Sequence, residues 1–308
     1  MLKMISNKAK AHIALLSLNT MYGANYLIAK GLMPEKIGAS ALVFLRIGSA
    51  GLLFFILKFF SKENVEKKDI PRLFLCGLLG VASNQFFSMN GLSLTSPVDA
   101  AIIVTAMPIF TIIISYFILK EPLTVQRILG IFMGGSGAIL LIYLGNSALG
   151  TGSLKGNIFI GLSALSFAFY LVLIKPLTAK YQPITIIFWT FLSGFIGMFP
   201  FCIDQLLDTD FTTYETSNWI SLCYVIIGPT FLAYLLNMFA LQYVKPAVSS
   251  SYIYVHPAVA MLLVAIITCF FPDSQYKGDI TVTKLFCCIL IFIGVYLIST
   301  NRLKWFKK

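Results

Sequence analysis

Polar side chains that could do chemistry occur inside long apolar stretches of this sequence. They carry hydroxyl, amide, phenol and imidazole groups, which donate and accept hydrogen bonds. Exposure of such groups to hydrocarbon is costly, so those placed at mid-depth of a membrane face a partner or a water-filled cavity. We therefore expect a cavity that binds a small molecule through hydrogen bonds. Its expected lining residues are Tyr22, Asn25, Asn84, Gln85, Thr105, Ser166, Tyr170, Thr230, Tyr234, Tyr252 and His256.

His256 is the sharpest single candidate because imidazole titrates near neutral pH. It could contact a ligand or couple transport to protons, or it could be a neutral histidine bonded to Tyr or Asn across the bundle. No Asp or Glu lies at mid-depth of an apolar stretch, and Asp99 falls near the end of one. A relay of protons through carboxylates is therefore not supported.

The sequence predicts no metal site, no cofactor and no catalytic residue. Only two histidines are present, and the six cysteines lie in apolar stretches without CxxC or paired-His spacing. We interpret these cysteines as small buried side chains. Cys202 and Cys269 are the one exception. A pairing of these two remains an alternative, because both are expected near the same outer face of the membrane.

Two charged residues near the apolar segments are interpreted as structural. An unpaired arginine such as Arg46 inside a span costs about 3 kcal/mol on insertion scales, so it should reach the interface, cap helix carbonyls or meet an anion. Glu121, in the corner LKEPLT, is expected to pair with Arg127 or to cap the following helix. The expected cavity residues carry no formal charge, which favours an uncharged or zwitterionic ligand.

The elements that position these residues follow from composition. Of 308 residues, 58% are hydrophobic and 11% are charged, against about a quarter charged in a soluble domain. The class is an all-α integral membrane protein, in contact with the lipid bilayer. The basic residues behind the net charge of +11 are scattered among short loops, so we expect no nucleic-acid partner.

Ten stretches are long enough to cross about 30 Å of hydrocarbon as helices. The first begins like a signal peptide but continues to Leu32 without a cleavage pattern, and we interpret it as a retained span. The ten lie at 11–32, 38–60, 70–94, 97–119, 125–145, 154–175, 184–207, 217–243, 246–271 and 280–303.

The chain contains an internal repeat. Pro97 and Pro108 are eleven residues apart, as are Pro246 and Pro257, and one offset of 149 relates the two pairs. A proline starts each helix, and the second one, inside the helix, frees a carbonyl and bends the axis. We therefore expect helix bends at Pro108 and Pro257 in two repeats, 1–145 and 146–308. With five spans in each, the second repeat must be inverted relative to the first.

Lys and Arg counts set the orientation. With both termini in the cytoplasm, seventeen fall on the cytoplasmic side, and five (Lys30, Lys36, Lys155, Lys277 and Lys284) fall outside. The predicted location is the bacterial inner (plasma) membrane, with multiple passes. The motif GIFMG at 130–134 allows close helix contact, either inside the fold or at a homodimer face.

With these features in place, the chain resembles the EamA family of the drug/metabolite transporter superfamily. The segments MYGANYLIAK, LVFLRI, NGLSLTSPVDAAIIVTAMPIFTIIISYFILKEPLT and LSFAFYLVLIKPL are similar to its recurrent motifs. The resemblance implies a cavity lined by the first, third, fourth, sixth, eighth and ninth helices, and export or exchange of small metabolites such as amino acids. The chain departs from the family pattern at Tyr22, where Trp is usual, and in the second repeat, where Phe270 stands opposite Glu121.

The leading hypothesis is a secondary transporter of a small organic metabolite that works by alternating access, which inverted repeats allow. The alternative is a polytopic membrane enzyme of the acyl- or phosphotransferase type, for which the sequence has no HxxxxD spacing and no cluster of embedded carboxylates. A passive channel fits bent, inverted halves less well. No phosphate-binding loop for ATP is present, so a concentration gradient is expected to drive transport.

Overall fold

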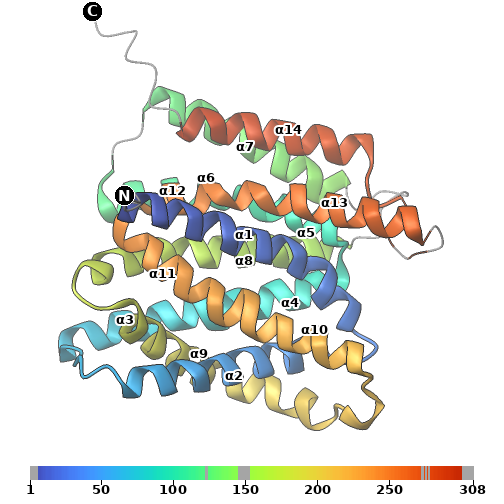
Figure 1. Ribbon diagram of the computed structural model, residues 1–308. Coiled ribbons are helices and arrows are strands. Elements are labelled where there is room, and N and C mark those ends of the chain that lie inside the picture. The colour runs from blue at the N-terminus through green and yellow to red at the C-terminus, as the bar shows by residue number, and fades with distance from the viewer. Residues whose placement is uncertain are drawn as a thin grey trace, which may run out of the picture.

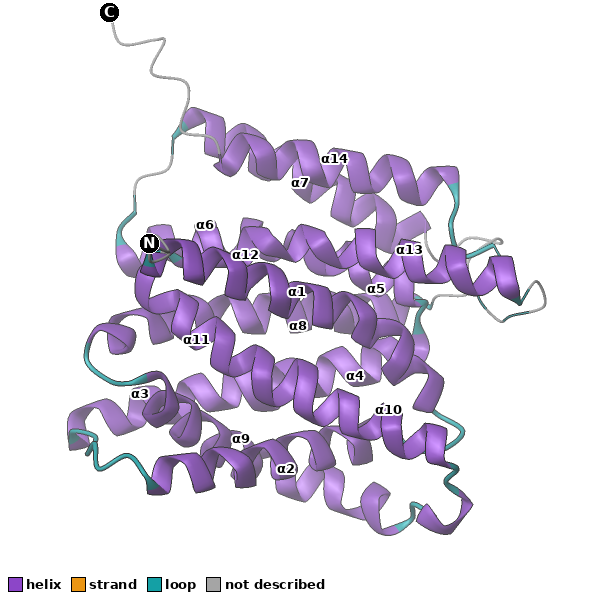
Figure 2. Cartoon of the chain, in the orientation of Figure 1, coloured by secondary structure: helices purple, strands orange, loops and turns teal. Residues whose placement is uncertain are grey.

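The computed structural model describes residues 6–121, 124–144, 153–271, 274, 276 and 278–299. The stretch GNSALGTG at 145–152, between the two repeats, lies outside these residues. So do Lys3, Lys277, the side chain of Arg127 and the basic residues Arg302, Lys304, Lys307 and Lys308. Within the described residues every regular element is helical (Figure 2), as the composition predicts.

The helices run lengthwise through one bundle (Figure 1). The α-helices of the first half are α1 (Asn7–Leu32), α2 (Ala39–Phe59), α3 (Ile70–Gly77), α4 (Asn84–Leu94), α5 (Pro97–Ile103), α6 (Met107–Leu119) and α7 (Val125–Leu144). Those of the second half are α8 (Leu154–Ile174), α9 (Pro183–Leu207), α10 (Thr216–Ile226), α11 (Ala233–Tyr243), α12 (Pro246–Ser251), α13 (Val255–Phe270) and α14 (Val282–Ser299).

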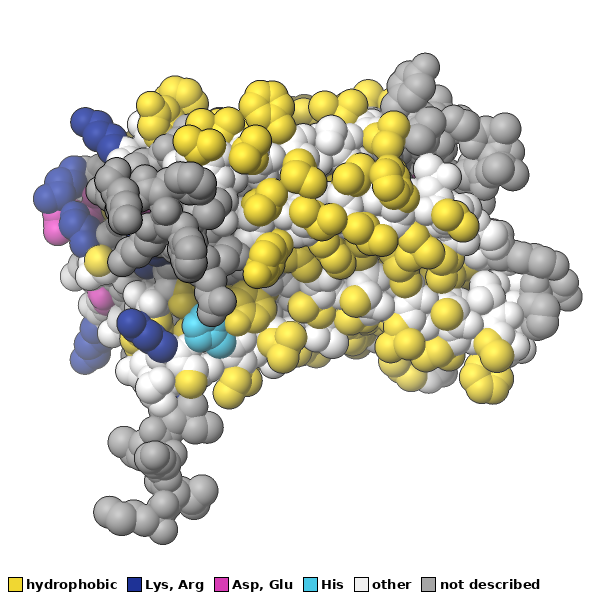
Figure 3. Space-filling model, turned by 90° about the horizontal axis from the view of Figure 1, so that it is seen from above, with side chains coloured by type: hydrophobic (Ala, Val, Ile, Leu, Met, Phe, Trp, Pro, Cys, Tyr) yellow, Lys and Arg dark blue, Asp and Glu magenta, His cyan; other side chains and the backbone are white. Residues whose placement is uncertain are grey.

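Apolar length supports several membrane crossings. In the described part of the chain, seven helical segments are long and apolar enough to span a bilayer: 39–59, 67–94, 97–119, 154–179, 183–207, 216–243 and 246–270. Hydrophobic side chains cover the middle of the face seen in Figure 3, and Lys and Arg gather at one end. The chain is a multi-pass membrane protein, while the count of ten spans stays a prediction.

Both halves are interrupted at matching points. A π-helical turn at Leu78–Ser83 joins α3 to α4, and one at Ile227–Leu232 joins α10 to α11. The offset between them is again 149. A 3₁₀ turn at Val104–Ala106 precedes α6, and another at Tyr252–Tyr254 precedes α13. Pro108 and Pro257 therefore stand in the first turn of a new helical segment, where a missing N–H is tolerated.

Equivalent helices of the two halves run in opposite directions. Lys30, near the end of α1, donates from Nζ to the carbonyls of Leu92 (3.0 Å) and Ser93 (2.9 Å) where α4 ends. The start of α8 lies at this same end, since the Ser153 amide donates to Leu94 O at 3.1 Å. At the other end of the bundle, Lys175 follows α8 and caps the carbonyls that end α11. Each half therefore uses one lysine to satisfy carbonyls that a helix terminus leaves free.

Helices α7 and α14 pack against each other at one edge of the bundle (Figure 1). Their close approach requires Gly294 of α14, where a Cβ would clash with the backbone nitrogen of Gly134 in α7. On α7, a Cβ on Gly134 would lie 2.8 Å from Ile109 Cδ1 of α6. The face of the GIFMG motif that carries Gly134 is thus used inside the fold. The start of α1 and the end of α14 lie at the same end of the bundle.

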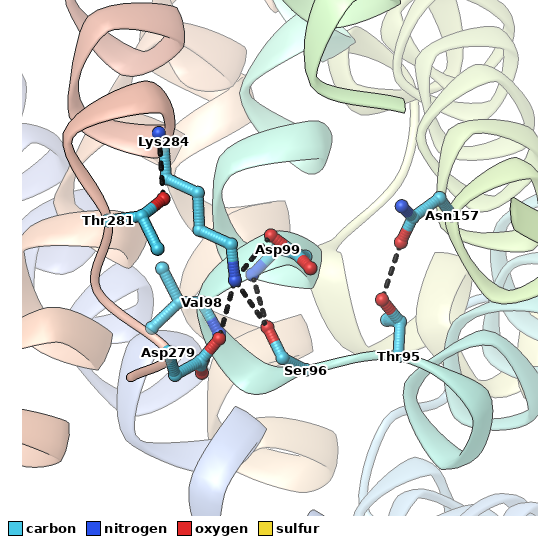
Figure 4. A network of polar contacts seen from close by, with 8 residues as sticks. All are labelled: Thr95, Ser96, Val98, Asp99, Asn157, Asp279, Thr281 and Lys284. Atoms are coloured by element: carbon cyan, nitrogen blue, oxygen red, sulfur yellow. Dashed lines mark hydrogen bonds and ion pairs between the residues drawn. The ribbon is translucent and has the colours of Figure 1, made fainter. Parts of the chain in front are cut away.

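Ion pairs connect the halves at both ends of the bundle. Lys284, in the first turn of α14, places Nζ 2.9 Å from Asp99 Oδ1 of α5 and 2.6 Å from Asp279 Oδ1 (Figure 4). All three side chains are 5% exposed or less. At the opposite end, Lys245 and Glu121 pair at 3.4 Å with exposed fractions of 69% and 19%. Glu121 thus pairs with a lysine of the other half.

Candidate functional site

Two adjoining pockets lie in the middle of the bundle. Counting the space that is open to solvent, the larger has an empty volume of about 580 Å³ and the smaller about 340 Å³. Tyr22, Tyr26, Asn84 and Ser88 line both, so the two form one continuous site.

The larger pocket is lined by both halves of the chain. Its walls combine apolar side chains with amides, hydroxyls and one imidazole. The lining residues are Leu18, Asn19, Tyr22, Tyr26, Asn84, Ser88, Val104, Met107, Ser163, Phe167, Leu171, Asn237, Ser249, Ser250, Ile253 and His256.

His256 is held in one tautomer. Asn19 donates from Nδ2 to Leu15 O at 2.6 Å, so its Oδ1 faces the ring and accepts from His256 Nε2 at 2.9 Å. The other ring nitrogen, Nδ1, then accepts from the Tyr26 hydroxyl at 3.3 Å. Both nitrogens are satisfied in the neutral form of a side chain that is 4% exposed. This arrangement favours a neutral histidine that orients the pocket wall.

Asn84 links the two halves in the pocket wall. Its Nδ2 donates to the backbone carbonyl of Ser163 (3.1 Å) and to Ser163 Oγ (3.0 Å) on α8. Its Oδ1 remains free to accept from a ligand. On the wall formed by the second half, Ser249 donates from Oγ to Asn237 Oδ1 at 2.9 Å. These bonds fix the amides in place before any ligand binds.

Of the residues expected in the cavity, six line the two pockets. Tyr22 and Asn84 line both, and His256 lines the larger one, while Asn25, Gln85 and Tyr234 line the smaller one. These six come from α1, α4, α11 and α13.

The other five expected residues line neither pocket. Ser166 and Thr230 donate from their hydroxyls to the carbonyls of Leu79 and Val225, both at 2.7 Å, and Thr105 donates to that of Ile102. Tyr170 packs against Gly80, and the Tyr252 hydroxyl is 2.7 Å from His12 Nδ1. Hydroxyls at mid-depth are thus partly used to satisfy carbonyls near the helix interruptions.

Some lining residues were not in the expected set. They are Asn19, Tyr26, Ser88, Ser163, Asn237, Ser249 and Ser250. Helical spacing offered a signal for part of them: Asn19 and Tyr26 stand three residues before and four after Tyr22, and Ser88 stands four after Asn84, on the same faces.

Arg46 of α2 lies in the wall of the smaller pocket and is 3% exposed. Its Nε donates to Thr230 Oγ1 at 2.9 Å and its Nη1 to Met89 Sδ at 3.0 Å. It therefore neither reaches the membrane interface nor caps a helix. The cavity contains a buried formal charge, which removes the reason for expecting an uncharged ligand.

The described residues contain no group of three or more His, Cys, Asp or Glu side chains placed to hold a metal ion. All six cysteines are free, including Cys202 and Cys269. The chemistry available in the pockets is hydrogen bonding, aromatic contact and one positive charge.

Comparison with known proteins agrees with this arrangement. Residues 9–143 and 154–300 each match the EamA-like transporter family. The uncharacterized transporter YdfC of Bacillus subtilis is 32% identical over 238 residues, covering 76% of this chain and 74% of YdfC. A probable terminal-alkyne amino-acid exporter of Streptantibioticus cattleyicolor is 22% identical over 64% of each chain. One crystal structure superimposes with a TM-score of 0.65 over 98% of this chain and 99% of the other, at 17% identity, which indicates a shared fold.

Proposed function

Because the chain belongs to the EamA-like transporter family, we propose that it exports or exchanges a small, amino-acid-like organic metabolite by alternating access. The proposed location is the bacterial plasma membrane, with both termini in the cytoplasm. Two inverted repeats, 1–145 and 146–308, would form the moving halves. The amino-acid exporter among the relatives supports the ligand class.

The observation that carries this proposal is the central pocket between the halves. Its polar walls come from α1 and α4 of the first half and from α8, α11, α12 and α13 of the second. The face of the bundle seen in Figure 3 is apolar along its middle. A ligand in this pocket would contact both halves, so their relative movement would change its access to either side of the membrane.

The paired helix interruptions support alternating access. Both π turns and both 3₁₀ turns stand at corresponding points of the two halves. An interrupted helix has fewer regular backbone hydrogen bonds at that point, so it can change direction there more readily than within a regular segment. Matching interruption points would let the halves exchange conformations.

The test is counterflow in proteoliposomes that contain the purified full chain. Vesicles loaded with one unlabelled candidate metabolite should take up the labelled form of the same compound faster than protein-free vesicles. Asn84→Leu should slow this uptake about five- to tenfold, since one or two ligand hydrogen bonds are lost. Asn90→Leu is the matched control, because Asn90 lies on the same helix, bonds to Phe86 O at 2.9 Å and lines neither pocket.

Uptake equal to that of protein-free vesicles across a broad metabolite panel would refute the transport proposal. Equal slowing by Asn84→Leu and Asn90→Leu would refute the role of the pocket in it.

A further inference from the structure

The smaller pocket holds a buried cation without a counter-ion. Arg46 makes no ion pair with any carboxylate of the described residues. A guanidinium carries five N–H groups, and here one from Nε goes to Thr230 and one from Nη1 goes to the weak acceptor Met89 Sδ. The end of the guanidinium, with one N–H on Nη1 and two on Nη2, is left for another partner.

Two buried amides beside Arg46 also have polar atoms without a well-formed hydrogen bond. Gln85, 2% exposed, has no hydrogen bond at Oε1 or Nε2, and Asn25, 4% exposed, has none at Oδ1. Both line the smaller pocket with Arg46. Buried polar groups are nearly always hydrogen-bonded, so three such atoms beside an unpaired cation indicate a place that a polar ligand group fills.

We propose that Arg46 binds the carboxylate of the transported solute, with Gln85 and Asn25 receiving the polar groups next to it. This inference rests on the proposed function and assigns it a substrate class, namely amino acids with an apolar side chain. Arg46 donates two parallel N–H bonds to the carboxylate oxygens, and Gln85 Nε2 adds a third donor. Gln85 Oε1 and Asn25 Oδ1 accept from the amino group of the solute.

The charge and shape of the site favour a carboxylate over a phosphate. Arg46 is the one permanently charged side chain among the lining residues of the two pockets. A single planar guanidinium matches a planar group with one negative charge, through a bidentate contact. A phosphate monoester would bring a second negative charge without a second cation to meet it.

The larger pocket takes the rest of the solute. It continues from the smaller one through Tyr22, Tyr26, Asn84 and Ser88. Apolar side chains extend its walls: Leu18, Val104, Met107, Phe167, Leu171 and Ile253. This lining suits an aliphatic or aromatic side chain.

The experiment uses counterflow of labelled L-leucine and L-phenylalanine in proteoliposomes of the full chain. Competition by the unlabelled amino acids is compared with competition by L-leucinamide and L-phenylalaninamide, which lack the carboxylate charge. For the wild type, the amides should need at least about a tenfold higher concentration to compete. Arg46→Met should slow uptake about 10- to 100-fold, as expected for loss of charge-assisted hydrogen bonds.

Two further variants keep the result interpretable. Arg46→Lys keeps the positive charge but not the bidentate geometry of the guanidinium, so its uptake rate should lie between those of the wild type and Arg46→Met. It replaces Arg46→Met in the test if the methionine variant does not fold. Arg72→Met is the matched control, since Arg72 donates from Nε to Leu173 O at 2.8 Å and lines neither pocket. It should transport like the wild type once the amount of folded protein is equalised.

The outcomes separate this inference from the transport proposal. Uptake that Arg46→Met leaves unchanged, or amides that compete as well as the acids, would overturn the carboxylate site while transport itself stands. Absence of uptake of both amino acids by the folded wild type would overturn the substrate class.

Discussion

Replacing Lys284 with methionine tests the buried ion cluster that joins the two halves. The lysine Nζ lies 2.6 Å from Asp279 Oδ1, 2.9 Å from Asp99 Oδ1 and 3.4 Å from Ser96 Oγ (Figure 4). Methionine keeps the apolar stem and removes the charge. Two carboxylates that are 0% and 2% exposed are then left facing each other without a cation.

The magnitude follows from the burial. Removing one partner of a buried ion pair costs about 3–5 kcal/mol, because the remaining charge is neither solvated nor paired. With a change of about 2–3 °C per kcal/mol for a chain of this size, the midpoint of thermal unfolding should fall by roughly 6–15 °C. Adding Asp99→Asn and Asp279→Asn to Lys284→Met should restore most of this loss, since both uncompensated charges are then gone.

The assay is thermal unfolding of the purified chain in detergent, followed by tryptophan fluorescence. Lys245→Met is the matched control, because Lys245 is 69% exposed in its pair with Glu121 and ion pairs open to solvent contribute about 0–1 kcal/mol. Equal midpoints for Lys284→Met and Lys245→Met would refute the argument. So would a triple variant that is no more stable than Lys284→Met.

Two further predictions concern packing and protons. Gly134→Leu should lower the midpoint of thermal unfolding, because even a Cβ there would lie 2.8 Å from Ile109 Cδ1 of α6. Gly135→Leu, with nothing within 4 Å of its Cβ, should change the midpoint little, and similar midpoints for the two variants would refute the close packing of α7 on α6. Counterflow should be insensitive to an imposed pH gradient. His256→Gln should retain more uptake than His256→Leu, because the imidazole acts here as one donor and one acceptor. If wild-type uptake follows the gradient and His256→Gln loses this response, the role of His256 as a neutral side chain is refuted.

The sequence identified part of the site because depth in the membrane can be counted along a helix. Asn84 and His256 stand near the centres of their spans, and both line the larger pocket. Depth alone does not say which way a side chain points around the helix axis. Ser166 and Tyr170 stand at similar depth on α8, but neither lines a pocket. Ser166 donates to the carbonyl of Leu79, and Tyr170 packs against Gly80.

For the charged residues, the surroundings of the side chains could not be predicted from the sequence. Lys284 counts toward the outer loops by position, but the packing of α14 buries it beside Asp99. From the sequence, Arg46 is interpreted as structural because an unpaired arginine in a membrane is costly. The sequence does not indicate that its side chain lies in a pocket wall, with hydrogen bonds to Thr230 and Met89.

The sequence by itself determined the membrane class, because composition is a property that can be counted along the chain. Proline spacing predicted two repeats with bends at Pro108 and Pro257, but it gave no sign of the π turns at Leu78–Ser83 and Ile227–Leu232. Only the tertiary structure decided which polar groups face the cavity and which charges pair. Those outcomes depend on the rotation of each helix about its axis and on contacts between distant segments, such as α2 with the π turn at Ile227–Leu232 and α5 with α14. Such rotations are set by the packing of the whole bundle.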